Sequence, residues 1–169
     1  MNETRYYALV GERPSAATAS RPDLWMTPDE AGAQHSANRL LEISGLRLGE
    51  FLRIFAVRTN VLTSAEKGRH EHVKAVDVAR RLLANAAADE RCAGILALGI
   101  QARRAFGLGF APPLLLVPTA GTRVAWMPHP SGHCRWWNLP GNCDAVMAFL
   151  RGCAVACSHL DAPPMQTRR

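Results

Sequence analysis

Three short stretches, far apart in the chain, carry side chains suited to chemistry. Glu12 follows the apolar run "YYALV", Asn60 lies in "RTNVL", and His129 lies in "MPHPSGHCRWWN". A carboxylate can orient a water molecule, an amide offers a donor beside an acceptor, and an imidazole can donate to a developing anion. Each residue taken alone also has an ordinary structural explanation, such as a solvated Glu in a turn or an Asn that satisfies local backbone.

Aromatic and basic side chains accompany these stretches. Trp25 lies in a long segment rich in Ala, Ser and Pro, where an indole could support a flipped base or pin the loop to the core. His133, Arg135, Trp136 and Trp137 follow the third stretch. Arginine beside aromatic rings suits base stacking and phosphate contact. We also expect one of the two adjacent tryptophans to pack into the core under the last helix.

Alternating strand and helix patterns predict the scaffold. Strands are expected at Tyr6–Val10, near Phe55–Val61, and in "RCAGILALG", "PPLLLVPTA" and "RVAWMPHPS". Helices are expected in "SANRLLEISGL" after an N-cap at Ser36, at the start of "LGEFLRIF", in "IQARRAFGL", and from an N-cap at Asn142. The clearest helix is "EHVKAVDVARRLLANAAADE", with an apolar stripe of Val73, Val76, Ala79, Leu82 and Leu83.

This order of elements predicts an α/β fold: a single-domain, three-layer αβα structure with a central, mainly parallel, short sheet of four to five strands. In such sheets a ligand binds at the carboxyl ends of the strands. The loops that begin near Gly11, Asn60 and His129 all follow expected strands. We therefore expect them to converge around a single hole sized for one pyrimidine.

Composition narrows the class of protein. The 169 residues fit one domain, and 48% hydrophobic residues suffice for a core. We expect the domain to cover residues 1–157, with 158–169 as a flexible tail. The chain has no apolar run of ~20 residues and no signal-peptide pattern at the N-terminus. These features predict a monomeric cytoplasmic protein without a membrane partner.

Charge and cysteine usage add two weaker indications. The net charge of +6 favours polyanions such as nucleic acid, although many basic proteins bind none. Five cysteines occur without a Cys-x-x-Cys pair. This pattern predicts reduced, buried thiols rather than a structural zinc or iron–sulfur site. We expect no metal and, from the family resemblance described below, no other cofactor.

In this order and spacing, the pieces resemble the uracil-DNA glycosylase superfamily. "VGERPS" is similar to the Gly-Glu-x-Pro motif of its iron–sulfur branch, and Trp25 stands where the family has a base-stacking aromatic residue. "TNVL" resembles the Thr-Asn-Val that ends another strand, "GILALGIQARRAFGL" resembles the strand–Gly–helix segment, and "HPS" at 129–131 resembles the motif that opens the DNA-penetrating loop. The resemblance spans roughly residues 6 to 152.

The resemblance implies hydrolytic excision of uracil, or a related deaminated or modified base, from single- or double-stranded DNA near the nucleoid. Two departures stand out. Arg13 replaces an acidic residue that several active members carry, so Glu12 is the expected base, and the N-terminal cysteine pair of the iron–sulfur branch is missing. The implied catalytic residues are Glu12, Asn60 and His129; the implied base-binding residues are Gly11, Arg13, Trp25 and Asn60; the implied DNA contacts are Ser15, Ser131, Gly132, His133, Arg135 and Trp136.

Three alternatives remain open from the sequence. One is a catalytically weak or inactive DNA- or uracil-binding protein of the same fold, in which Arg13 has abolished the chemistry. Another is an enzyme of this scaffold for a different substrate, such as hypoxanthine, a modified uracil or a nucleotide. The third is a flavodoxin-like small-ligand protein, which would lack the steep salt dependence that phosphate contacts give to DNA binding.

Overall fold

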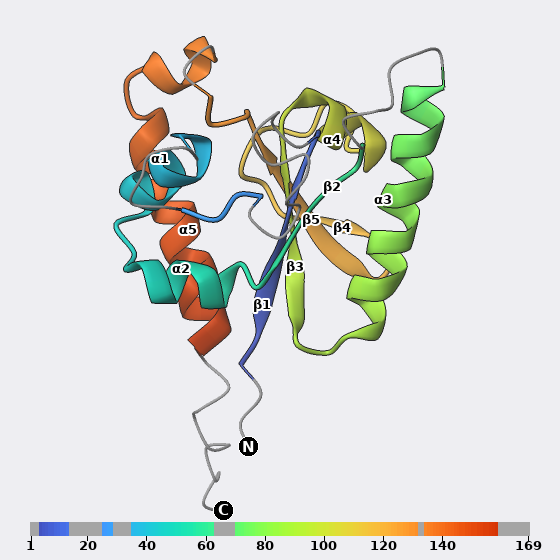
Figure 1. Ribbon diagram of the computed structural model, residues 1–169, viewed down its shortest axis with the longest axis horizontal. Coiled ribbons are helices and arrows are strands. Elements are labelled where there is room, and N and C mark those ends of the chain that lie inside the picture. Colours follow the sequence, from blue (N-terminus) through green and yellow to red (C-terminus); the bar gives the residue numbers. More distant parts are fainter. Residues whose placement is uncertain (1–3, 14–24, 29–34, 63–69, 132–133, 159–169) are drawn as a thin grey trace, which may run out of the picture.

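The protein folds as a five-stranded sheet with helices on both faces (Figure 1). This computed structural model describes residues 4–13, 25–28, 35–62, 70–131 and 134–158. The expected α/β class is confirmed, including the three layers and the mainly parallel sheet. The expected tail beyond Ser158 lies outside the described residues.

The strands are β1 (Tyr6–Gly11), β2 (Val57–Asn60), β3 (Cys92–Leu98), β4 (Val117–Thr119) and β5 (Thr122–Met127), in the spatial order β2-β1-β3-β5-β4. All neighbouring pairs are parallel except β4 with β5. Within the sheet Gly11 pairs with Asn60, and Leu98 pairs with Met127. The carboxyl ends of four strands therefore meet at one edge.

Both faces of the central strands are apolar because helices cover both. In β3, Leu96 and Leu98 face one core cluster, while Ile95 and Ala97 face the other. This alternation follows from the two-residue repeat of a strand. The continuous run "ILAL" is thus a strand buried on two sides, as the sequence pattern predicts.

One face of the sheet is covered by α1 (His35–Ser44), α2 (Leu48–Ile54) and α5 (Asn142–Ser158) (Figure 1). Leu40, Phe51 and Leu150 from these helices are fully buried there. The expectation of N-caps at Ser36 and Asn142 is wrong, because α1 begins at His35 and already includes Ser36, and α5 begins at Asn142 itself. The Asn142 side chain instead donates a hydrogen bond to the Trp136 carbonyl, at 2.7 Å.

The other face is covered by α3 (Glu71–Ala88) and α4 (Ile100–Ala105). The expected stripe on α3 is partly wrong. Val73 is 57% exposed, and the buried residues are Ala75, Ala79, Leu83 and Ala86. Small alanines let the helix lie close to the sheet, and the apolar pattern alone overweighted the larger valines.

Strand β4 is shorter than the sequence pattern predicts. Only Val117–Thr119 of the expected strand "PPLLLVPTA" is extended in the sheet, and that short strand β4 runs antiparallel to β5.

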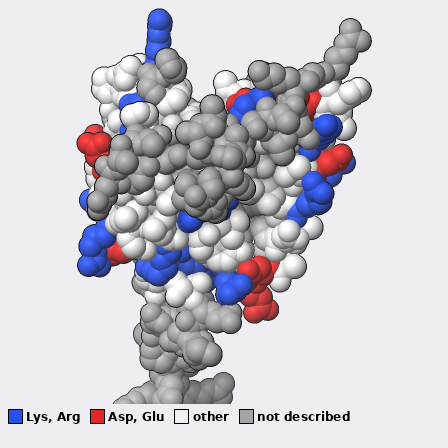
Figure 2. All heavy atoms as spheres, in the orientation of Figure 1, with Lys and Arg blue, Asp and Glu red and all other residues white. Residues whose placement is uncertain are grey.

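In the part of the chain that the structure describes, no helix has the length and apolar character needed to cross a membrane. Basic and acidic side chains are both spread over the surface seen in Figure 2, including the side where α3 lies.

Candidate active site

Backbone hydrogen bonds hold the first two sequence motifs against each other. The Val61 N–H donates to the Gly11 carbonyl at 3.0 Å, and the Leu62 N–H donates to the Glu12 carbonyl at 2.9 Å. These bonds continue the β1–β2 pairing beyond the strand ends. The turn after β1 and the turn after β2 consequently form one rigid corner of the site, although 49 positions of sequence separate their strands' last residues, Gly11 and Asn60.

Gly11 is required for close packing at this corner. A Cβ atom at Gly11 would lie 2.1 Å from Trp25 Cζ2, 2.7 Å from Trp25 Cη2 and 2.9 Å from Asn60 Oδ1. The indole and the amide are therefore both against the Gly11 backbone. Trp25 is only 4% exposed and belongs to the core cluster under α1, α2 and α5. The structure thus brings together three residues that lie in three separate stretches of the sequence.

Asn60 carries an unsatisfied acceptor. Its Oδ1 is buried and has no hydrogen-bond partner among the described residues. A buried polar atom without a partner costs about 1–3 kcal/mol. A ligand with an N–H group at this point would recover that cost, so Asn60 is poised to accept a hydrogen bond from a bound molecule.

A second glycine, Gly99, brings Glu12 and His129 together. A Cβ atom placed on Gly99 would lie 3.7 Å from Glu12 Oε2 and 3.6 Å from His129 Cβ. Gly99 adopts φ +88°, a conformation that favours glycine, and its N–H donates to the Met127 carbonyl at 2.9 Å. The Glu12 carboxylate and the His129 side chain therefore both lie beside Gly99, at the ends of β1, β3 and β5.

His129 is held rigidly and is only partly accessible. Pro128 and Pro130 on either side of it are buried, and the Trp137 indole N–H donates to its carbonyl at 2.9 Å. Burial lowers the pKa of His129 below its ordinary value of 6.5. The imidazole is therefore neutral at pH 7 and can present an N–H donor without carrying a positive charge.

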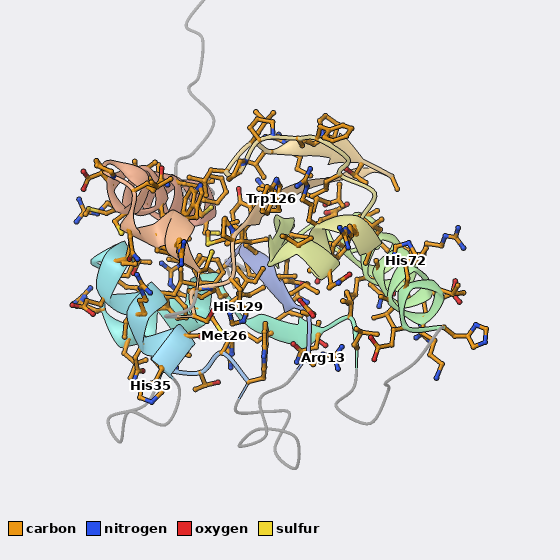
Figure 3. All side chains as sticks on the ribbon, turned by 90° about the horizontal axis from the view of Figure 1, so that it is seen from above. Arg13, Met26, His35, His72, Trp126 and His129 are labelled. Atoms are coloured by element: carbon orange, nitrogen blue, oxygen red, sulfur yellow. The ribbon has the colours of Figure 1, made fainter. Side chains whose placement is uncertain are left out.

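Arg13 points from this edge toward α3 (Figure 3). Its guanidinium donates to Glu71 Oε2 at 3.2 Å and lies 4.0 Å from Glu12 Oε1. The side chains of all three residues are about one-third exposed, at 32%, 28% and 34% respectively. Arg13 is thus an ion-pair partner of two carboxylates at the border of the site, one of which is the candidate base.

The predicted DNA contacts are described only in part. Ser15, Gly132 and His133 lie outside the described residues. Ser131 is half-buried and Arg135, at the start of the short 3-10 helix Arg135–Asn138, is exposed.

The expectation that one tryptophan of the pair is a core residue is confirmed, because Trp137 is 3% exposed. Trp136 remains half-buried and stands edge-on to Trp137, with ring centroids 5.2 Å apart. Trp136 is therefore the member of the pair that retains accessible surface for a partner, and Trp137 anchors the loop that carries His129.

A hollow of about 600 Å³ adjoins Asn60 on its α3 side. Its walls are residues 60–62, at the end of β2, and five residues of α3 from Lys74 to Arg81. Gly11, Glu12, Trp25 and His129 are not among its lining residues. Contacts at Gly11 and Gly99 bring residues of the three motifs close together, whereas this hollow lies toward α3, and a pyrimidine-sized hole between the motifs stays a prediction.

Sequence reasoning missed two parts of this arrangement. Gly99 was noticed only within the strand–Gly–helix resemblance, although a lone glycine directly after an apolar strand is itself a signal for close backbone approach. The basic face of α3 was assigned no role. Its signal was the spacing of Lys74 and Arg81, which are seven residues apart and hence on one helical face.

The cysteines are consistent with structural thiols. All five are free, with Cys92, Cys153 and Cys157 buried and Cys134 and Cys143 half-buried. Burial and the neighbouring Cys157 raise the pKa of Cys153 to about 12. Across the described ranges, no three or more His, Cys, Asp and Glu side chains are grouped so that they could hold a metal ion.

A comparison of the chain with protein-family models and with curated proteins finds no match.

Proposed function

We propose that this chain is a monofunctional DNA glycosylase that extrudes a uracil, or a related deaminated base, and hydrolyses its bond to deoxyribose. The observation that carries the proposal is the buried Oδ1 of Asn60, which has no hydrogen-bond partner among the described residues and lies beside Trp25 over Gly11. Glu12 and His129 both lie beside Gly99. The resemblance of these motifs to uracil-DNA glycosylases supports the same conclusion.

The amide of Asn60 supports selection of uracil over cytosine. Uracil presents an N–H donor at N3 beside a carbonyl acceptor at O4, and an amide side chain offers the complementary acceptor and donor. Cytosine presents an acceptor at N3 beside an amino donor, so its pattern is reversed relative to uracil. Oδ1 of Asn60 lies over Gly11 without a hydrogen-bond partner among the described residues, which supports its use as the acceptor for the uracil N3–H.

The proposed reaction is hydrolysis of the glycosidic bond, during which negative charge develops on the uracil ring. The C1′–N1 bond breaks, its electron pair stays on the uracil ring, and a water oxygen forms a new bond to C1′. In this scheme Glu12 orients that water and accepts its proton, while the neutral His129 donates a hydrogen bond to the uracil anion. A preorganised donor of this kind contributes about 3–4 kcal/mol to the lowering of the barrier. Neither a metal nor an organic cofactor takes part.

The free-energy cost of extruding the base differs between duplex and single-stranded DNA. A base within a duplex must be unstacked first, at a few kcal/mol, whereas a single strand offers the base at lower cost. In this proposal the enzyme acts as a monomer on DNA in the cytoplasm. Arg135 and Trp136, which are exposed and half-buried respectively, supply phosphate contact and stacking surface next to His129.

The test is base release from an oligonucleotide that contains one uracil, detected as alkali-labile strand scission. His129→Ala and Asn60→Ala should each reduce the single-turnover rate by about 10²–10³-fold, by analogy with the loss of one preorganised donor. His72→Ala and Asn85→Ala, which change exposed residues of α3, are the matched controls and should leave the rate unchanged. Undetectable release by the wild-type protein, or equal rates in the site variants, would refute the proposal.

A second candidate function is favoured by Arg13. Its guanidinium lies between the carboxylates of Glu12 and Glu71, at a position where active members of the resembled family carry an acidic residue. A protein of this kind would bind a uracil-containing strand without releasing the base. In the same assay it would retard the oligonucleotide in a gel and leave the glycosidic bond intact, and Asn60→Ala would weaken the retardation.

A further inference from the structure

The hollow beside Asn60 has an apolar floor and a basic rim. Its floor at the end of β2 is formed by Val61 and Leu62, which are both buried, and Val78 of α3 adds an apolar, half-buried contact. Its volume of about 600 Å³ is comparable with that of small-molecule sites. The hollow is open to solvent, so it is a groove rather than an enclosed cavity.

The rim of this groove carries an excess of positive charge. Lys74, Arg80 and Arg81 line it, and Asp77 is the one carboxylate among its described lining residues. Arg80 pairs with that carboxylate at 3.4 Å. Arg81 is exposed and makes no ion pair with another residue in the described ranges. The groove therefore favours an anionic ligand.

Two of the positively charged side chains of the groove lie along one face of α3. Lys74, Val78 and Arg81 follow each other at successive turns of one helical face. At 1.5 Å per residue, the two cations are about 10 Å apart along the helix. This spacing suits an elongated anion with several charges better than a single compact one.

Asn60 connects the groove to the candidate active site. Its side chain touches the space over Gly11 beside Trp25, and the same residue forms one wall of the groove. A nucleotide whose base is bound at Asn60 would therefore have its neighbour in the strand within reach of the groove. The apolar floor can take a sugar or base, and the basic rim can take phosphates.

We propose that this groove binds the sugar–phosphate backbone of the DNA strand adjacent to the nucleotide at Asn60, so that a single strand leaves the site along α3. The inference rests on the proposed action on DNA and adds the path of the strand. It identifies Arg81 as a phosphate contact. Phosphate contacts release condensed counterions, and each one contributes about 0.7 to the salt dependence of single-strand affinity.

The test measures binding of a fluorescent decathymidylate, which contains no uracil, by anisotropy between 50 and 200 mM salt. Arg81→Ala should reduce the magnitude of the slope of log affinity against log salt by about 0.7, which corresponds to an affinity loss of about eightfold at 50 mM salt relative to 1 M. Arg151→Ala removes the same charge from an exposed position of α5, on the opposite layer, and should leave the slope unchanged. Thermal unfolding of both variants verifies that their folds are intact.

Three outcomes would refute the proposal that the groove binds a DNA strand. They are an unchanged slope in Arg81→Ala, an equal change in Arg151→Ala, and displacement of the decathymidylate by thymidine monophosphate at the same affinity, which would indicate a site for one phosphate rather than for a strand. The outcome is independent of catalysis, because the probe has no excisable base. Base release by the wild type together with an unchanged slope in Arg81→Ala would refute only the proposed strand path. A reduced slope in Arg81→Ala without base release by the wild type would support the strand path and refute only the proposed glycosylase activity.

Discussion

Replacement of Gly11 by alanine tests the packing on which the candidate site depends. The new Cβ atom would lie 2.1 Å from Trp25 Cζ2, whereas carbon atoms in contact are about 3.5–4.0 Å apart. The indole would therefore have to move by at least about 1 Å. Trp25 is 4% exposed and packs in the core, so this movement would disturb its neighbours.

The expected magnitude follows from core overpacking, which costs about 1–3 kcal/mol. For a chain of this length, 1 kcal/mol shifts Tm by about 2–4 °C. Gly11→Ala should therefore lower Tm by about 2–12 °C, less the small gain from a less flexible unfolded chain. The same movement pushes Asn60 Oδ1, at 2.9 Å from the new atom, out of its position, so base release should fall together with stability.

The assay is thermal and urea unfolding combined with the base-release measurement. Gly49→Ala is the matched control, because a Cβ atom on Gly49 of α2 would meet nothing within 4 Å. It should leave base release unchanged and should not lower Tm. Trp25→Phe removes the two ring atoms that clash, so the double variant Gly11→Ala/Trp25→Phe should be more stable than the sum of the single effects predicts.

A Gly11→Ala protein that unfolds within about 0.5 kcal/mol of the wild type would refute this reasoning, since surface substitutions change stability by that amount. Additive effects in the double variant would also refute it, because side chains in contact show interaction free energies of about 0.5–3 kcal/mol. Either result would mean that Trp25 does not lie against the turn after β1.

The remaining predictions concern protonation. Burial lowers the pKa of His129 below 6.5, so the unfolded chain binds a proton that the folded chain excludes, and the free energy of unfolding should fall as pH decreases from 7 through 6.5 toward the lower folded value. Urea unfolding of His129→Gln should show a smaller loss over this range, and an identical pH dependence would contradict the assignment. Burial and Cys157 raise the pKa of Cys153 to about 12, so at pH 8 a thiol reagent should modify half-buried Cys134 and Cys143 well before Cys153. Equal rates at all five thiols would contradict the burial pattern.

The sequence predicted the elements because their signals are local. The run "CAGILAL" is apolar at every position, as expected for a strand covered on both faces, and the alternation of such runs with helical patterns predicted the layered α/β fold. The stripe on α3 was misjudged at Val73 because apolar character does not reveal how close a helix lies to the sheet. There, the small side chains of Ala75 and Ala79 make the contact.

The residue types of the candidate site could also be read from the sequence, because Glu12, Asn60 and His129 each follow a strand in a parallel sheet. Only the tertiary structure decided how they meet. The close packing at Gly11 and Gly99 and the pairing of Arg13 with Glu71 depend on distances between segments remote in the chain, as does the lack of a partner for Asn60 Oδ1 among the described residues. Such distances are determined by strand order and by the packing of both helical layers, which no local pattern of residues specifies.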